Sequence, residues 1–128
     1  MMPTPEELRQ LVERYAAAVS ARDIDTVLTL FAEEAVQRDP ATSPPNVGHE
    51  AIGTFLRNGV GASTATTFEA LAVHTAGDHV AIDFRVSVTL ASGTMVIEGI
   101  EVFTVGGDGR IVEVVAYWDD DDVTFTEP

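Results

Sequence analysis

The sequence predicts an α+β fold in which three helices precede an antiparallel sheet. Two observations predict it. Apolar residues recur at helical spacing up to about residue 57, and from about residue 66 they alternate with polar residues, as in strands with one buried face. Helices first and antiparallel strands afterwards are typical of the α+β class. The 128 residues, 45% of them hydrophobic, suit a single domain over residues 1–128 with one packed core.

Two helices are predicted before residue 36. The first begins after Thr4, a favourable N-cap, with Pro5 in its first turn and apolar residues at helical spacing behind it. The second begins at Asp23, another N-cap residue, and its apolar face extends to Phe31. We therefore expect a short turn between two amphipathic helices.

A loop and a third helix follow. Residues 37–47 contain Pro40, Pro44 and Pro45, so a loop is expected there after a short extended piece. Apolar residues at helical spacing then predict a helix over about residues 49–57, which glycines at 59 and 61 bring to an end.

Four strands are predicted in the second half, over residues 66–76, 80–90, 94–105 and 111–118. Both faces of the third strand are largely apolar, which is typical of a strand covered on two sides. A sheet curved around the helices would leave a pocket between the layers, and Gly99 is expected to mark a bend that aids the curvature. The acidic run 119–122 is predicted to be a solvated turn or a frayed end.

The charge balance and two missing residue types exclude several functions. With 21 acidic and 7 basic residues the net charge is −14, which disfavours nucleic acid and anionic membrane surfaces as partners. Lys and Cys are both missing, which removes Schiff-base lysines, thiol nucleophiles, disulfides and thiolate metal sites. The three His residues show no metal-ligand spacing, so no metal site is predicted. The start of the chain does not read as a secretion signal and no apolar run approaches bilayer length, so we expect a cytoplasmic protein.

Three polar residues depart from the expected pattern. Tyr15 is in phase with the apolar face of the first helix, and Glu101 lies between apolar neighbours of the third strand. Asp39 directly precedes Pro40, which keeps it out of the helical conformation. Each has an ordinary structural explanation: a buried tyrosine bonded to a backbone carbonyl, a glutamate at a sheet edge or paired with Arg85, and a loop aspartate.

Taken together, the three residues suit proton abstraction next to a carbonyl. A buried carboxyl without a cation keeps its proton, so Glu101 and Tyr15 would be neutral donors and Asp39 the carboxylate base. The base would take the proton while the two donors hold the enolate oxygen as charge develops on it. This chemistry needs no cofactor.

Several segments resemble, in order along nearly the whole chain, the Δ5-3-ketosteroid isomerase family of the nuclear-transport-factor-2-like superfamily. They are ERY at 13–15, DID at 23–25, LFAEEAV at 30–36, RDP at 38–40, GHEAI at 48–52, FRV at 84–86, IEV at 100–102, GRI at 109–111 and AYW at 116–118. The resemblance implies a cone-shaped sheet wrapped around three helices with a deep apolar pocket. It also implies a homodimer.

The resemblance assigns roles to individual residues. Asp39 falls where the family has its general base, Tyr15 where it has its oxyanion-hole tyrosine, and Glu101 where it has a protonated aspartic acid. The family is itself the established example of a carboxylic acid kept neutral near pH 7. Phe84 and Trp118 match pocket-wall positions and Ile82 and Val86 occupy neighbouring ones, so the resemblance implies that these four residues form the substrate-binding wall. Two departures stand out: Glu replaces Asp at 101, and Phe31 and Leu56 occupy positions where some members carry tyrosines behind the catalytic one.

The resemblance and the residues together predict a steroid delta-isomerase without a cofactor, acting on a small apolar ketone such as a 3-oxo-Δ5-steroid. Two alternatives stay open. One is a related enzyme for another enolisable carbonyl, such as a polyketide cyclase. The other is a protein that binds an apolar ligand without turning it over. An epoxide hydrolase would need an Asp-Arg-Asp cluster that the sequence does not offer.

Overall fold

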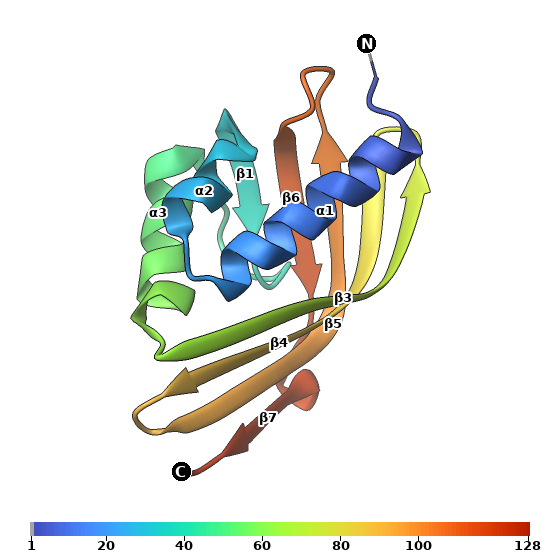
Figure 1. The fold of residues 1–128 in the computed structure, drawn as a ribbon. Helices are drawn as coiled ribbons and strands as arrows, with labels where there is room; N and C mark the ends of the chain where they lie inside the picture. The colour runs from blue at the N-terminus through green and yellow to red at the C-terminus, as the bar shows by residue number, and fades with distance from the viewer. Residues whose placement is uncertain (1) are drawn as a thin grey trace.

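The computed structural model describes residues 2–128 and shows three helices against one face of a curved sheet (Figure 1). Helix α1 spans Pro5–Ser20, α2 spans Ile24–Thr29 and α3 spans Gly48–Asn58. Thr4 caps α1 as predicted: its hydroxyl accepts from the Glu7 amide at 3.1 Å, and the Glu7 carboxylate accepts from the Thr4 amide at 2.9 Å. Asp23 caps α2 by accepting from the amide of Thr26.

The predicted end of the second helix was wrong. Helix α2 ends at Thr29, and Phe31 opens strand β1, which spans Phe31–Arg38. Phe31 pairs with Ile111 of β6 in a parallel ladder, and the Ile111 amide donates to the Leu30 carbonyl at 2.9 Å. Helical spacing of apolar residues cannot reveal a partner eighty residues away, so the local pattern extended the helix too far.

The sheet has seven strands. Besides β1 they are β2 (Asn46–Val47), β3 (Ala65–Ala76), β4 (His79–Leu90), β5 (Gly93–Val105), β6 (Ile111–Tyr117) and β7 (Val123–Thr126). The order is β2-β1-β6-β5-β4-β3, and β7 pairs with β5. The four predicted strands are confirmed as β3 to β6. All pairs are antiparallel except β1 with β6, so the sheet is mixed and not purely antiparallel as predicted.

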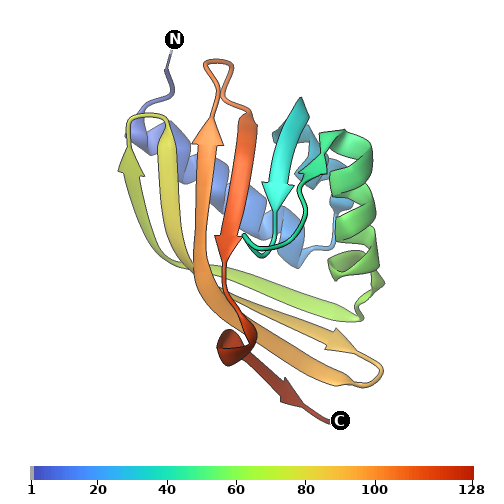
Figure 2. The same cartoon turned by 180° about the vertical axis from the view of Figure 1, so that it is seen from behind.

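The chain end forms more structure than predicted. Residues Asp120–Asp122 make an exposed 3-10 turn, in agreement with a solvated turn, but the following residues form strand β7 and do not fray. Strand β7 pairs with β5 over Thr94 to Ile97, where β6 no longer runs beside it. Figure 2 shows β7 continuing the sheet beyond the end of β6.

Gly99 lies where strand β5 changes its neighbour from β6 to β7. A Cβ atom there would meet the Tyr117 carbonyl oxygen, with Trp118 Cβ at 3.1 Å and a Phe84 ring carbon at 3.2 Å. The sheet bends here around the helices, as Figures 1 and 2 show. A glycine is therefore required by the close approach of three strands at the bend.

Replacing this glycine should destabilise the fold. Gly99→Ala is expected to lower the free energy of unfolding by about 1–3 kcal/mol, because the methyl group overpacks against backbone that cannot yield. Gly61→Ala is the matched control, since the nearest atom to its Cβ would be at an ordinary 3.4 Å. Urea unfolding of both variants measures the difference, and equal midpoints would contradict the role given to Gly99.

In a single chain the face of the sheet that packs against the helices is buried, and the opposite face is partly exposed. Ile97, Glu101, Phe103 and Val105 of β5 are buried, whereas Ile100 on the opposite face is 42% exposed. The prediction that β5 is covered on both sides is therefore wrong for one chain on its own. In the part of the chain that the structure describes, no helix is long and apolar enough to span a bilayer.

Candidate active site

A cavity of about 430 Å³ lies between the helices and the concave face of the sheet. Its walls come from α1, the end of α3, and strands β3, β4 and β5, together with residues that follow β1 and β6. Most of the lining is apolar: Val19, Pro40, Phe55, Leu56, Gly59, Val60, Phe68, Phe84, Val86, Val88, Leu90, Met95 and Ile97. Its polar members include Tyr15, Asp39 and Glu101, so all three residues singled out in the sequence line the same cavity.

Tyr15 reaches the cavity from the middle of α1 and is 4% exposed. Its ring is packed edge-on by three phenylalanines, with centroids 6.3 Å from Phe31, 5.4 Å from Phe68 and 5.1 Å from Phe103. Burial, and then the carboxylates of Glu101 and Asp39, raise the pKa of the Tyr15 hydroxyl well above its ordinary value. The hydroxyl therefore keeps its proton and can act as a hydrogen-bond donor.

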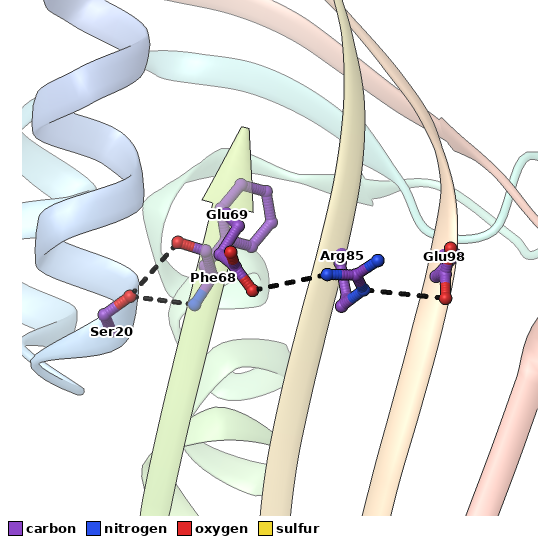
Figure 3. A network of polar contacts seen from close by, with 5 residues as sticks. All are labelled: Ser20, Phe68, Glu69, Arg85 and Glu98. Atoms are coloured by element: carbon purple, nitrogen blue, oxygen red, sulfur yellow. Dashed lines mark hydrogen bonds and ion pairs between the residues drawn. The ribbon is translucent and has the colours of Figure 1, made fainter. Parts of the chain in front are cut away.

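Helix α1 is held against the cavity wall through Ser20, its last residue. The Ser20 hydroxyl oxygen accepts from the Phe68 amide at 2.8 Å and donates to the Phe68 carbonyl at 3.4 Å (Figure 3). Phe68 stacks on Phe84 at 5.6 Å and lies edge-on to Tyr15. The amide and the carbonyl of Phe68 both bond to Ser20 at the end of α1. These contacts therefore fix helix α1, and with it Tyr15, relative to strand β3.

Glu101 is a buried carboxyl group without a cation. It is 3% exposed, and its Oε1 has no hydrogen-bond partner among residues 2–128. Burial first, and then the charge of Asp39, raise the pKa of Glu101 well above its ordinary value. Burial therefore favours the protonated form of Glu101, which carries an O–H donor.

The alternative explanations of Glu101 are wrong. Arg85, the suggested cation, lies on the other face of the sheet, 3.9 Å from Glu69 and 3.5 Å from Glu98 (Figure 3). Glu101 is paired on one side with Ile82 and on the other with Ala116, so it is inside the sheet and not at an edge.

Asp39 follows strand β1 and is half-buried at the cavity. The indole Nε1 of Trp118 donates to its Oδ1 at 2.7 Å, and the amide of Ala41 donates to the Ala116 carbonyl at 2.7 Å, which fastens the turn to β6. Burial raises the pKa of Asp39, and the hydrogen bond from Trp118 opposes that rise. Of the two cavity carboxyls, Asp39 ionises more readily, because only it has a donor to stabilise its charge.

Sequence reasoning placed Trp118 on the cavity wall and missed its hydrogen bond to Asp39. Trp118 does line the cavity. The indole N–H could have predicted this hydrogen bond, because a tryptophan in a pocket wall needs an acceptor for it. Asp39 was the carboxylate already assigned to the same pocket. The long separation in sequence hid the pairing.

Three of the four predicted wall residues line the cavity, namely Phe84, Val86 and Trp118, and Ile82 does not. Ile82 is 1% exposed, pairs with Glu101 and belongs to the hydrophobic core. Its side chain is part of the core, so this prediction is corrected. Further wall residues were overlooked, although Met95 and Ile97 share the Glu101 face of β5 by simple alternation.

The arrangement of polar groups in the cavity suits acid–base chemistry. Among residues 2–128, no three or more His, Cys, Asp or Glu side chains gather in a group that could hold a metal ion. Asp39, the more readily ionised of the two carboxyl groups, and two groups whose burial favours the protonated form line one mostly apolar cavity, where electrostatic interactions are stronger than in water. Such a site can move a proton and hold the oxygen on which negative charge develops.

Comparisons with known proteins agree with this chemistry at the level of a family. A family model described as a SnoaL-like domain matches residues 12–114. The steroid delta-isomerase of Nocardioides simplex is 32% identical over 120 residues, which cover 94% of this chain and 96% of that protein.

Solved structures share the fold at lower identity. SalBIII, described as an epoxide hydrolase/cyclase-like enzyme in pyran ring formation in polyether salinomycin, has a TM-score of 0.87 at 22% identity and covers 94% of this chain and 97% of its own. A computationally designed 17-OHP binder has a TM-score of 0.85 at 18% identity, with 95% and 98% covered. RV0760c from Mycobacterium tuberculosis has a TM-score of 0.84 at 22% identity, with 93% and 99% covered.

Proposed function

This chain belongs to the SnoaL-like domain family of NTF2-like folds and is a relative of steroid delta-isomerases, and from that premise we propose that it is a steroid delta-isomerase without a cofactor. It would move the C5–C6 double bond of a 3-oxo-Δ5-steroid to C4–C5. The observation that carries the proposal is the buried, unpaired Glu101 that shares a mostly apolar cavity with Asp39.

In the first step the ionised Asp39 takes a proton from C4 of the substrate. The electron pair of the broken C–H bond moves to form the dienolate, and the negative charge gathers on the C3 oxygen. Tyr15 and Glu101 donate hydrogen bonds to that oxygen. Both stay protonated because burial raises their pKa values, so each gives a hydrogen bond without giving up its proton.

In the second step the protonated Asp39 returns the proton at C6. The dienolate collapses to the ketone, and the double bond now lies between C4 and C5, so atoms and electrons balance with no other reactant. Apolar walls hold the fused rings and gain about 25 cal/mol per Å² of buried surface. The walls also keep water away from the dienolate.

The direct test is turnover of 5-androstene-3,17-dione, followed by the absorbance of the conjugated enone that forms. We expect isomerisation at neutral pH without added metal or cofactor. If the protein bound the steroid but did not turn it over, the second open function, binding of an apolar ligand, would replace the isomerase proposal. Turnover of a different enolisable ketone alone would favour the cyclase-like alternative.

Removing the indole donor should move the pH profile. Trp118→Phe takes away the one hydrogen bond that lowers the pKa of Asp39 and leaves the burial that raises it. Because the base must be ionised, the acidic limb of the kcat/KM profile should shift to higher pH in this variant. At pH values above the shifted limb the variant should recover most of the wild-type kcat/KM. A pH profile with an unmoved acidic limb would show that the indole does not stabilise the carboxylate.

We also propose that two chains pair through the outer face of the sheet. Ile100 and Tyr117 are neighbours across the β5–β6 ladder and are 42% and 53% exposed, and Val102 and Val115 pair beside them. A second copy would cover this apolar patch. Light scattering should give twice the 13.7 kDa of one chain, and Ile100→Glu should give the mass of one chain. A wild-type mass of 13.7 kDa would refute the pairing.

A further inference from the structure

The cavity extends along strand β5 from a buried end at Glu101 to a more exposed end at Met95, called here its open end, and the strand register gives its direction. Glu101 pairs with Ile82, and Met95 pairs with Val88 six residues along β5. At about 3.3 Å per residue these two rungs are about 20 Å apart. Exposure increases in the same direction, since Glu101 is buried and Met95 is half-buried. A flat ligand with its ketone at Glu101 would therefore point its far end toward Met95.

Asn58, the last residue of α3, lies at the open end. It is exposed and lines the cavity. The segment that follows it reaches Thr64, whose amide donates to the Thr89 carbonyl at 2.8 Å, next to Leu90 at the end of β4. This bond joins the segment that follows α3 to the half of the sheet that is remote from Glu101.

The polar groups of the cavity are unevenly distributed between its two ends. Among its lining residues only Tyr15, Asp39, Glu101, Trp118 and Asn58 have polar side-chain groups, and the first four belong to the acid–base site and its indole donor. Asn58 is the remaining one. A side-chain amide both donates and accepts hydrogen bonds, so it can bind a carbonyl or a hydroxyl group.

The charges around the cavity determine whether the polar group at the far end of a ligand can be charged. None of the lining residues is Lys, Arg or His, two of them are carboxylic acids, and the chain carries a net charge of −14. A carboxylate or phosphate at the far end of a ligand would be repelled and would meet no cation. The cavity thus favours an uncharged ligand along its whole length.

We propose that Asn58 determines specificity by binding an uncharged carbonyl or hydroxyl group at the end of the substrate remote from the reacting ketone. The substrate class is then a neutral, flat, apolar ketone with a second neutral oxygen function at its far end. This inference rests on the proposed function for the position of the reacting ketone, and it adds the group that is recognised at the opposite end.

The test measures binding and needs no turnover. Dissociation constants are determined for 4-androstene-3,17-dione, for 4-androsten-3-one, which lacks the distal oxygen, and for 3-oxo-4-androstene-17β-carboxylate. The proteins are the wild type, Asn58→Leu and Thr54→Val. Thr54 is the matched control because it is exposed one turn earlier on α3 and does not line the cavity.

Asn58→Leu should reduce the preference for the dione over the mono-ketone by about fivefold, which is the worth of one hydrogen bond. Thr54→Val should leave that preference unchanged, and the carboxylate should bind weakest to the wild type. An equal preference in wild type and Asn58→Leu would overturn the inference, as would tight binding of the carboxylate or failure of all three steroids to bind. Binding differences without isomerase activity would instead reject the proposed function and leave the role of Asn58 standing.

Discussion

Asp39→Asn should reduce kcat for 5-androstene-3,17-dione by about 10³-fold, within the 10²–10⁴-fold contribution of a positioned general base. The amide cannot accept the C4 proton, but its oxygen can still accept the hydrogen bond from Trp118. Because the substitution also removes a desolvated charge, we expect no loss of stability. Steady-state kinetics and thermal unfolding on the same preparation measure both effects.

The matched control is Asp83→Asn, which neutralises an exposed aspartate on β4 outside the cavity. It should keep full activity, which separates loss of the base from loss of one negative charge in a chain of net charge −14. If Asp39→Asn turned over steroid at the wild-type rate, another group would have to be the base.

Glu101→Leu should lower turnover by about 10²–10³-fold while making the protein more stable. The loss is that of one donor to the oxyanion. The gain arises because leucine fills a similar volume and removes a buried oxygen that has no partner, a group whose burial costs about 1–3 kcal/mol. A glutamate with only a structural role would show the opposite result, a loss of stability with little change in chemistry.

The pH dependence of stability should change in the same variant. Burial raises the pKa of Glu101, so above the ordinary glutamate pKa of 4.5 the folded protein holds a proton that the unfolded chain has released. Wild-type stability should therefore decrease as the pH rises from about 4.5 toward the raised pKa. The Glu101→Leu variant should lack the part of this decrease in stability that comes from Glu101. The part that comes from Asp39, whose pKa is also raised, should remain in the variant.

Glu98→Leu is the control for both measurements. Glu98 is on the same strand but on the other face, exposed and next to Arg85. Its replacement should leave turnover and the slope of stability against pH near their wild-type values. If Glu101→Leu behaved in the same way as Glu98→Leu, Glu101 would have no part in the oxyanion site.

The local pattern of the sequence determined most of the elements that build the cavity. Capping residues at Thr4 and Asp23 set the starts of two helices, and alternation set strands β3 to β6, because both signals come from neighbouring residues. The same alternation put Glu101 between apolar neighbours of β5, and helical phase put Tyr15 on the apolar face of α1; both are buried. The same patterns singled out the three polar residues that line one cavity, and the resemblance to a family assigned a role to each.

Tertiary structure decided what depends on partners far along the chain. Strand β1 forms because Phe31 pairs with Ile111, and β7 forms because β5 has an open edge where β6 ends. The hydrogen bond from Trp118 to Asp39 joins residues 79 positions apart, and it sets the balance between burial and charge on that carboxylate. Ile82 shares its face with Phe84, yet it is packed within the hydrophobic core, whereas Phe84 lines the cavity. A sequence pattern specifies which face of an element is apolar, whereas only the packing of elements decides whether that face meets another side chain or an empty space.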